Sequence, residues 1–159
     1  MPNRIIVKMG DLVISDREGD ILTSVLGSCV GVVMFDRKSP LTGMAHIMLP
    51  ERGKGMPEGE RRAKYAGPGV MALLQEMLKR GARREDLFAK LCGGARLFGE
   101  NSLQNIGERN IAMTRAALRR LGVPVQAERV GGETGRNVSV EVGSGKVIIR
   151  VAGGAMEVI

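Results

Sequence analysis

The stretch LGSCVGVVMF, residues 26–35, joins a turn of small residues to a continuous apolar run. Residues 30–35 show no alternation of polar and apolar side chains, which is typical of a strand buried on both faces. Gly27 and Ser28 permit a tight turn and a close backbone approach directly before Cys29. The stretch therefore predicts a central strand whose first turn presents a cysteine, which is either a core residue or a nucleophile.

Short apolar or alternating segments on either side predict further strands. They cover residues 4–14, 21–25, 44–49, 87–92, 123–127, 138–142 and 146–151, and the last two form a hairpin. Apolar residues at helical spacing predict one helix through residues 70–78, ended by Gly81, and another over residues 107–120, ended by Gly122. The polar segment 51–64, rich in glycine, proline and charge, predicts a mobile loop.

These elements predict an α+β fold, a layered sandwich of mixed or antiparallel β-sheet with two main helices. A length of 159 residues suits a single domain over residues 1–159. Aromatic residues make up only 3% of the chain, so aliphatic residues and the 10 methionines must fill the core.

The composition excludes several functional classes. No apolar run approaches the roughly 18 residues of a membrane span, and the amino terminus lacks a signal-peptide core, so we expect a cytoplasmic protein without membrane insertion. The 2 cysteines and 1 histidine, with no C-x-x-C pair, argue against a zinc site, and we expect no metal. The absence of a cofactor is an expectation that comes only from the family resemblance described below. The net charge of +7 is explained for most basic residues by solvated faces of helices and loops, and an acidic protein partner is the second interpretation. Nucleic acid is disfavoured because the chain has only 1 tyrosine and 3 phenylalanines for base stacking.

Cys29 and His46 are the candidate catalytic residues. A cysteine nucleophile reacts as its thiolate and needs a lowered pKa, which predicts fast alkylation near neutral pH. His46 lies in a second short apolar strand, and two neighbouring strands can bring a thiol and an imidazole together. The backbone N–H groups around Gly27 and Ser28 could stabilise an oxyanion. The alternative is that both residues are ordinary members of a core.

Five sequence blocks add weight to the catalytic interpretation. They are LGSCVGVVMFD (26–36), GMAHIMLP (43–50), AKLCGGARLF (89–98), NIGERN (105–110) and GGETGR (131–136). In this order and spacing they resemble the CheD family, the chemotaxis deamidases of receptor glutamines, over residues 10–151. The resemblance implies a cysteine-hydrolase fold related to the catalytic domain of cytotoxic necrotizing factor toxins.

The resemblance also implies an activity and partners. The expected reaction is hydrolysis of selected glutamine side chains to glutamate on methyl-accepting chemotaxis receptors through a Cys thioester, with weak glutamyl methylesterase activity as a side reaction. A CheC-type phosphatase, which acts on CheY-phosphate, is the expected regulatory partner. A non-catalytic module that binds receptors and such a phosphatase is the alternative function.

The same resemblance assigns residues to roles. Cys29 matches the nucleophile, His46 the base, and Thr23 the third group, whose hydroxyl would orient the imidazole. From the residues alone, Thr23 is an ordinary β-branched strand residue.

Other matched residues receive structural roles. Gly93-Gly94 and Gly131-Gly132 are expected to shape the backbone beside the site. Arg136 either holds loop carbonyls or a carboxylate, or lies solvated on the surface. Cys92 departs from the family pattern and is expected to be structural.

Overall fold

Strand β4 (Val30–Asp36) lies at the centre of the molecule, and its two faces pack against different layers. Val30, Val32 and Met34 belong to an apolar cluster shared with the helices. Val33 and Phe35 belong to a second cluster, shared with the other sheet. The predicted strand buried on both faces is therefore confirmed.

The computed structural model describes residues 2–53, 61–97, 105–151 and 153–159. The elements are β1 (Arg4–Ile6), β2 (Leu12–Ser15), β3 (Ile21–Leu26), β4 (Val30–Asp36), β5 (Thr42–Ile47), α1 (Ala66–Lys79), the 3₁₀ helix η1 (Arg84–Asp86), β6 (Leu87–Gly93), α2 (Ile106–Leu121), β7 (Val125–Val130), β8 (Arg136–Glu141), β9 (Val147–Val151) and β10 (Met156–Val158). The predicted α+β class, with mixed sheets and two main helices, is confirmed.

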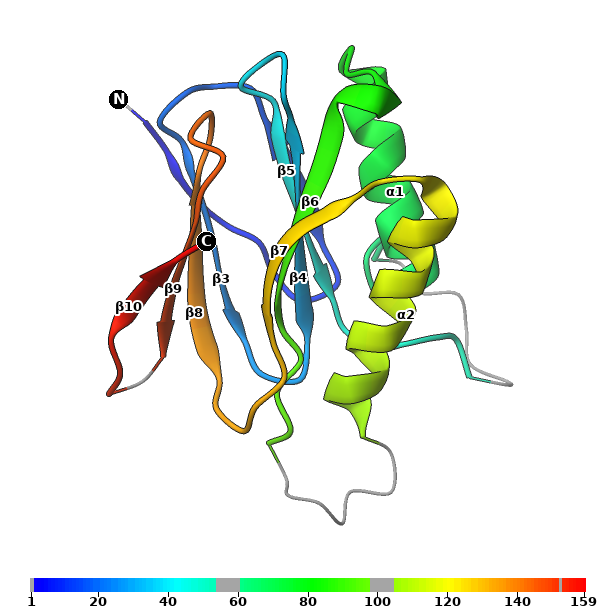
Figure 1. Cartoon of the computed structure of the whole chain (residues 1–159), viewed down its shortest axis with the longest axis vertical. Helices are drawn as coiled ribbons and strands as arrows, with labels where there is room; N and C mark the ends of the chain where they lie inside the picture. Colours follow the sequence, from blue (N-terminus) through cyan, green and yellow to red (C-terminus); the bar gives the residue numbers. More distant parts are fainter. Residues whose placement is uncertain (1, 54–60, 98–104, 152) are drawn as a thin grey trace.

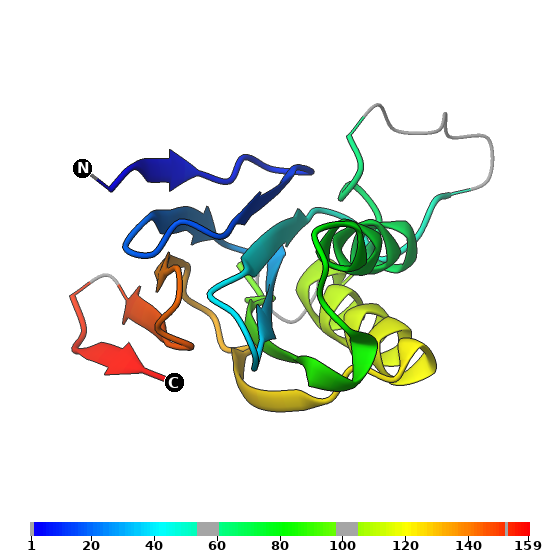
Figure 2. The ribbon, with the colours of Figure 1, turned by 90° about the horizontal axis from the view of Figure 1, so that it is seen from above.

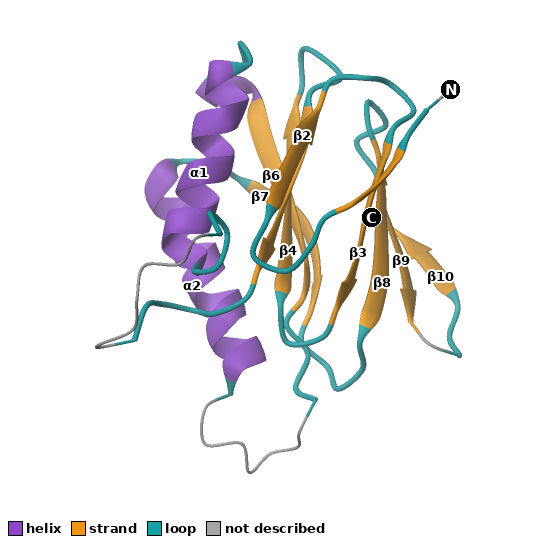
Figure 3. Cartoon of the chain, turned by 180° about the vertical axis from the view of Figure 1, so that it is seen from behind, coloured by secondary structure: helices purple, strands orange, loops and turns teal. Residues whose placement is uncertain are grey.

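The strands form two five-stranded sheets, in the orders β1-β3-β8-β9-β10 and β2-β5-β4-β6-β7. Each sheet is mixed, because β1 pairs with β3, and β6 with β7, in parallel. The sheets stand side by side, and α1 and α2 cover the far face of the second sheet (Figure 1). The view from above shows no helix on the outer side of the first sheet (Figure 2). The helices, the second sheet and the first sheet therefore form three successive layers (Figure 3).

The structure corrects two details of the expected strand pattern. Residues 4–14 form not one strand but β1 and β2, which belong to different sheets. The chain turns between them, where Asp11 N–H donates to the Lys8 carbonyl and Gly10 has a φ of +80°. The short strand β10, which pairs with β9, was not predicted. Of the predicted loop 51–64, residues 54–60 lie outside the described part.

The helices end where the glycines predict. Gly122 follows α2 with a left-handed φ of 75°, and Gly81 follows the end of α1 with a φ of +100°. None of the helices among the described residues has the length and apolar character needed to cross a membrane.

Helix α2 begins in close contact with the segment that follows β6. A Cβ added to Gly107, the second residue of α2, would collide with the backbone carbonyl oxygens of Gly94 and Ala95. The helix can take this position only because residue 107 has no side chain.

Gly107→Ala should lower the free energy of unfolding by about 1–3 kcal/mol, because backbone carbonyls cannot rotate away from the new methyl group. Gly67→Ala is the matched control at the second residue of α1, where the nearest atom to the new Cβ is Arg120 Nη2 at 3.9 Å. That variant should be neutral or more stable by up to about 1 kcal/mol. Denaturant unfolding measures both, and equal stabilities would contradict the close approach of α2.

Candidate active site between the two sheets

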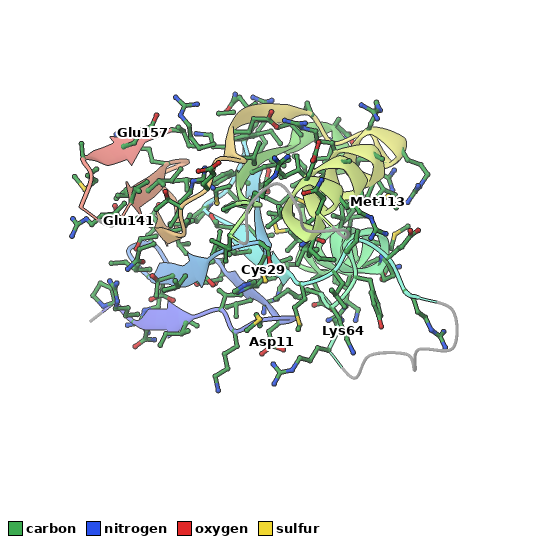
Figure 4. All side chains as sticks on the ribbon, turned by 90° about the horizontal axis from the view of Figure 1, so that it is seen from below. Asp11, Cys29, Lys64, Met113, Glu141 and Glu157 are labelled. Atoms are coloured by element: carbon green, nitrogen blue, oxygen red, sulfur yellow. The ribbon has the colours of Figure 1, made fainter. Side chains whose placement is uncertain are left out.

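The turn Gly27-Ser28-Cys29 crosses from the first sheet to the second. It leaves β3 at Leu26 and enters β4 at Val30, at the lower end of the molecule in Figure 1. The view from below shows Cys29 near the middle of this end (Figure 4). Its side chain belongs to the apolar cluster between the sheets and retains 9% of its exposure.

Strand β5 places His46 on the same face of the sheet as Cys29. The antiparallel register pairs Val30 with Ile47 and Gly31 with His46. Cys29 lies two residues before Gly31, just outside β4, on the diagonal position to His46 if the register is extended by one residue. The Cys29 thiol and the ring do not hydrogen-bond in this structure, since His46 Nε2 has no partner among the described residues. The directly opposite position holds a glycine, so no side chain stands there beside the ring. The register therefore places the two predicted site residues at one end of the same pair of strands.

Hydrogen bonds on one side of the His46 ring determine its tautomer. His46 Nδ1 lies 2.8 Å from Ser24 Oγ and 3.1 Å from the Val7 carbonyl oxygen. Ser24 Oγ in turn donates to the Val7 carbonyl over 2.8 Å. Because a carbonyl oxygen only accepts, Nδ1 carries the proton and donates. Nε2 is then the basic nitrogen, and it is buried without a hydrogen-bond partner among the described residues.

Burial keeps both members of the pair neutral. It raises the pKa of the Cys29 thiol to about 11. It also lowers the pKa of His46, an effect that the hydrogen bond to Val7 and the charge of Asp11 partly oppose. At neutral pH the site therefore holds a thiol and an imidazole, not an ion pair. The direction of the Cys29 pKa shift is opposite to the expected lowering of the thiol pKa, because the sulfur lies in an apolar layer and burial disfavours its charged form.

The carbonyl groups of the turn are held from outside it. Ala95 N–H donates to the Gly27 carbonyl at 2.9 Å, and Gly94 N–H donates to the Cys29 carbonyl at 2.8 Å. The N–H groups of Gly27, Ser28 and Cys29 donate to no acceptor among the described residues. The arrangement therefore leaves N–H groups beside the sulfur free to receive an oxyanion.

A family model described as "CheD chemotactic sensory transduction" matches residues 48–151, more than half of the chain. A probable chemoreceptor glutamine deamidase CheD of Moorella thermoacetica is 38% identical over 162 residues, covering 99% of this chain and 96% of that protein. A chemoreceptor glutamine deamidase CheD of Halalkalibacterium halodurans is 40% identical, with 91% of each chain covered. A probable one of Caldanaerobacter subterraneus is 37% identical, with 92% of each covered.

The chain belongs to the CheD family. The family model begins two residues after His46, so its match does not include Cys29, His46 or Thr23. The similarity to the Moorella CheD protein covers 99% of the chain and so extends through the strands that carry these residues.

Thr23, the third group expected from the CheD resemblance, does not contact the imidazole. Its hydroxyl donates to the Val138 carbonyl at 3.0 Å and lies 3.3 Å from Ser139 Oγ. Successive strand residues point to opposite faces of a sheet, so Thr23 and Ser24 cannot both face His46. In this structure the groups that contact the ring are the Ser24 hydroxyl and the Val7 carbonyl, not the Thr23 hydroxyl. Thr23 is connected to the site through its backbone: its carbonyl accepts a hydrogen bond from Val7 N–H at 2.8 Å, and the Val7 carbonyl contacts the His46 ring.

The glycines and the arginine of the CheD motifs shape the walls of the site. Arg136 donates to the carbonyl oxygens of Gly93 and Gly131, at 3.1 and 2.6 Å, so of the alternatives left open it is the residue that holds loop carbonyls. Gly93 has a φ of +94°, and a Cβ there would collide with the Cys29 carbonyl oxygen. A side chain at position 93 is thus excluded by the turn that carries Cys29.

Cys92 lies in the same interior layer but away from solvent. It is 1% exposed, its thiol donates to the Gly31 carbonyl at 3.8 Å, and burial raises its pKa to about 12. These surroundings fit a structural residue. Within the described ranges, no cluster of three or more His, Cys, Asp or Glu side chains is placed to bind a metal ion.

Ser24→Ala should weaken the anchoring of His46, with a loss of about 1 kcal/mol for one hydrogen bond, and lower the His46 pKa further because the imidazolium loses an acceptor. Thr23→Val, one residue away on the other face, is the control and should leave the ring unaffected. Because the chain has 1 histidine, NMR titration follows a single imidazole in each variant. A Thr23→Val protein with the larger effect would restore the original assignment.

Iodoacetamide labelling of Cys29 should be slow at neutral pH and rise about tenfold per pH unit towards its pKa of about 11, because only the thiolate reacts. The Cys92→Ala background leaves Cys29 as the sole thiol of the chain. A rate that reaches its plateau near neutral pH would show that the thiol is ionised in the resting protein.

Proposed function

We propose that this chain is a protein-glutamine deamidase that converts glutamine side chains of chemotaxis receptors to glutamate. One observation carries the proposal: Cys29 directly precedes the strand that pairs with the His46 strand, and the Nε2 of the ring is unpartnered among the described residues. The names of the CheD relatives, chemoreceptor glutamine deamidases, support the choice of substrate.

The first chemical step forms a bond between Cys29 Sγ and the carbonyl carbon of the glutamine side chain. His46 Nε2 accepts the thiol proton as the sulfur attacks, and the carbonyl π electrons move onto oxygen. The N–H groups of Ser28 and Cys29 would receive the resulting oxyanion; their lack of an acceptor among the described residues supports this role. Ser24 and the Val7 carbonyl hold the Nδ1 side of the ring, so the imidazolium keeps its orientation.

The second step breaks the carbon–nitrogen bond. His46 returns its proton to the departing nitrogen, ammonia leaves, and a thioester joins Cys29 to the substrate. Water then attacks the thioester while His46 accepts a proton from it. Collapse of this second intermediate breaks the sulfur–carbon bond, and the sulfur recovers its proton, which leaves a glutamate side chain and the original pair.

A neutral resting pair suits this sequence of steps. With the pKa of Cys29 raised to about 11, almost no thiolate is present before the substrate arrives. Proton transfer to His46 then accompanies carbon–sulfur bond formation, and no charged thiolate has to persist in the apolar layer between the sheets. The same thioester can form from a glutamyl methyl ester with loss of methanol, and we propose weak methylesterase activity, measured as methanol release.

A non-catalytic binding module is the second candidate, and the burial of Cys29 with its raised thiol pKa favours it. In that case the surface alone would bind receptors. A CheC-type phosphatase is a proposed partner under either function, tested by co-elution with the wild-type protein and with Cys29→Ala.

The deciding experiment incubates a receptor cytoplasmic fragment with the protein and measures intact mass and ammonia. Each conversion of glutamine to glutamate adds about one dalton and releases one ammonia by this route. Binding of the fragment without either change would favour the non-catalytic module.

Cys29→Ala should abolish ammonia release while the fold is retained, because the change removes the nucleophile and only a small volume. Cys92→Ala is the matched control in the same layer and should keep most of the activity, at a packing cost of about 1–2 kcal/mol. Circular dichroism confirms folding of both proteins before activity is compared. Activity that survives Cys29→Ala, or disappears in folded Cys92→Ala, would mean that Cys29 is not the nucleophile.

A further inference from the structure

Helix α2 carries a buried side chain that contacts the site but takes no part in the proposed chemistry. Asn110, the last residue of the NIGERN block, has no exposed surface. Its Nδ2 donates to the Ser28 carbonyl at 2.9 Å and to the Met48 carbonyl at 3.0 Å. The Asn110 NH2 group therefore donates one hydrogen bond to each of two backbone carbonyls that lie in different segments.

The two acceptors flank the reacting pair. Ser28 directly precedes Cys29, and Met48 follows His46 by two residues. Val30 and Ile47 form the terminal residue pair between β4 and β5. If the pairing continued by one residue, Cys29 would lie opposite Met48. The Asn110 amide thus joins the ends of the two strands where the paired register between them stops.

This contact differs from the other restraints on the turn. The Gly27 and Cys29 carbonyls accept from backbone N–H groups, whereas the Ser28 carbonyl accepts from a side chain. Asn110 Oδ1 is buried without a hydrogen-bond partner among the described residues. An unpaired buried acceptor costs free energy, so a residue that served packing alone would be better replaced by an apolar one.

From these contacts we infer that Asn110 is a positioning residue, which holds the nucleophile turn and the end of the His46 strand at the separation that proton transfer requires. The inference rests on the proposed thiol chemistry. Fixing the Ser28 carbonyl also fixes the peptide plane between Ser28 and Cys29, and with it the direction of the Cys29 N–H that receives the oxyanion.

The test compares Asn110→Leu and Asn110→Asp with Thr114→Val. Leu and Asp are close to Asn in size, and both remove the amide donors. Thr114 is the control: it lies one turn further along α2, is fully buried, and its hydroxyl has no partner among the described residues. Each protein is assayed well below its own melting temperature for kcat and KM on the receptor fragment.

For both Asn110 variants, kcat should fall at least about tenfold with KM nearly unchanged, because misplacement of reacting groups affects the transition state more than binding. Thr114→Val should match the wild type. A lower melting temperature with wild-type kcat would show a purely structural role and overturn the inference. Failure of both Asn110 variants to fold would overturn it as well, since the residue would then determine the fold.

A second readout separates this inference from the proposed function. The dependence of Cys29 alkylation on pH, measured in the Cys92→Ala background, requires no receptor. If the wild-type protein releases no ammonia, the deamidase proposal fails, but a changed pH profile in folded Asn110→Leu would still show that Asn110 positions the thiol. An unchanged profile together with unchanged kcat in Asn110→Leu would overturn the inference.

Discussion

The site depends on one constraint: the turn between β3 and β4 must cross from one sheet to the other while its carbonyl groups stay hydrogen-bonded. Backbone N–H groups of the segment after β6 hold the carbonyls of Gly27 and Cys29, and Asn110 holds that of Ser28. With these carbonyls fixed, the Ser28 and Cys29 N–H groups, which share peptide planes with the Gly27 and Ser28 carbonyls, are fixed in direction and donate to no acceptor among the described residues. Glycines at positions 93 and 107 let β6 and α2 approach closely enough to make these bonds.

Burial of the site has opposite consequences for stability and chemistry. The apolar layer between the sheets stabilises the fold by removing the side chains of Leu22, Leu26 and Val33 from water. The same layer disfavours a charge on Cys29 or His46, so the resting pair is neutral. A neutral thiol is protected from adventitious alkylation and oxidation, since both require the thiolate. Activation then depends on the substrate and on the orientation of the His46 ring.

The orientation of the His46 ring depends on contacts between segments that are distant in sequence. The Val7 carbonyl comes from the chain after β1, the Ser24 hydroxyl from β3 and the ring itself from β5. The first two belong to one sheet or its extension, whereas β5 belongs to the other. The inter-sheet packing therefore sets the tautomer of His46, and any change in the spacing of the sheets would alter the chemistry of its Nε2.

The sequence by itself determined the strand over residues 30–35 and the helix ends at Gly81 and Gly122, and it singled out Cys29 and His46 as the candidate pair. Apolar periodicity and the backbone freedom of glycine act within a few residues, so they can be read from the sequence. The ordered motifs indicated the CheD family. Only the tertiary structure decided which hydroxyl faces the imidazole, because Thr23 and Ser24 are adjacent and alternate between the faces of β3. It also decided the raised thiol pKa and the contacts of Asn110, since desolvation and long-range hydrogen bonds depend on which segments pack together.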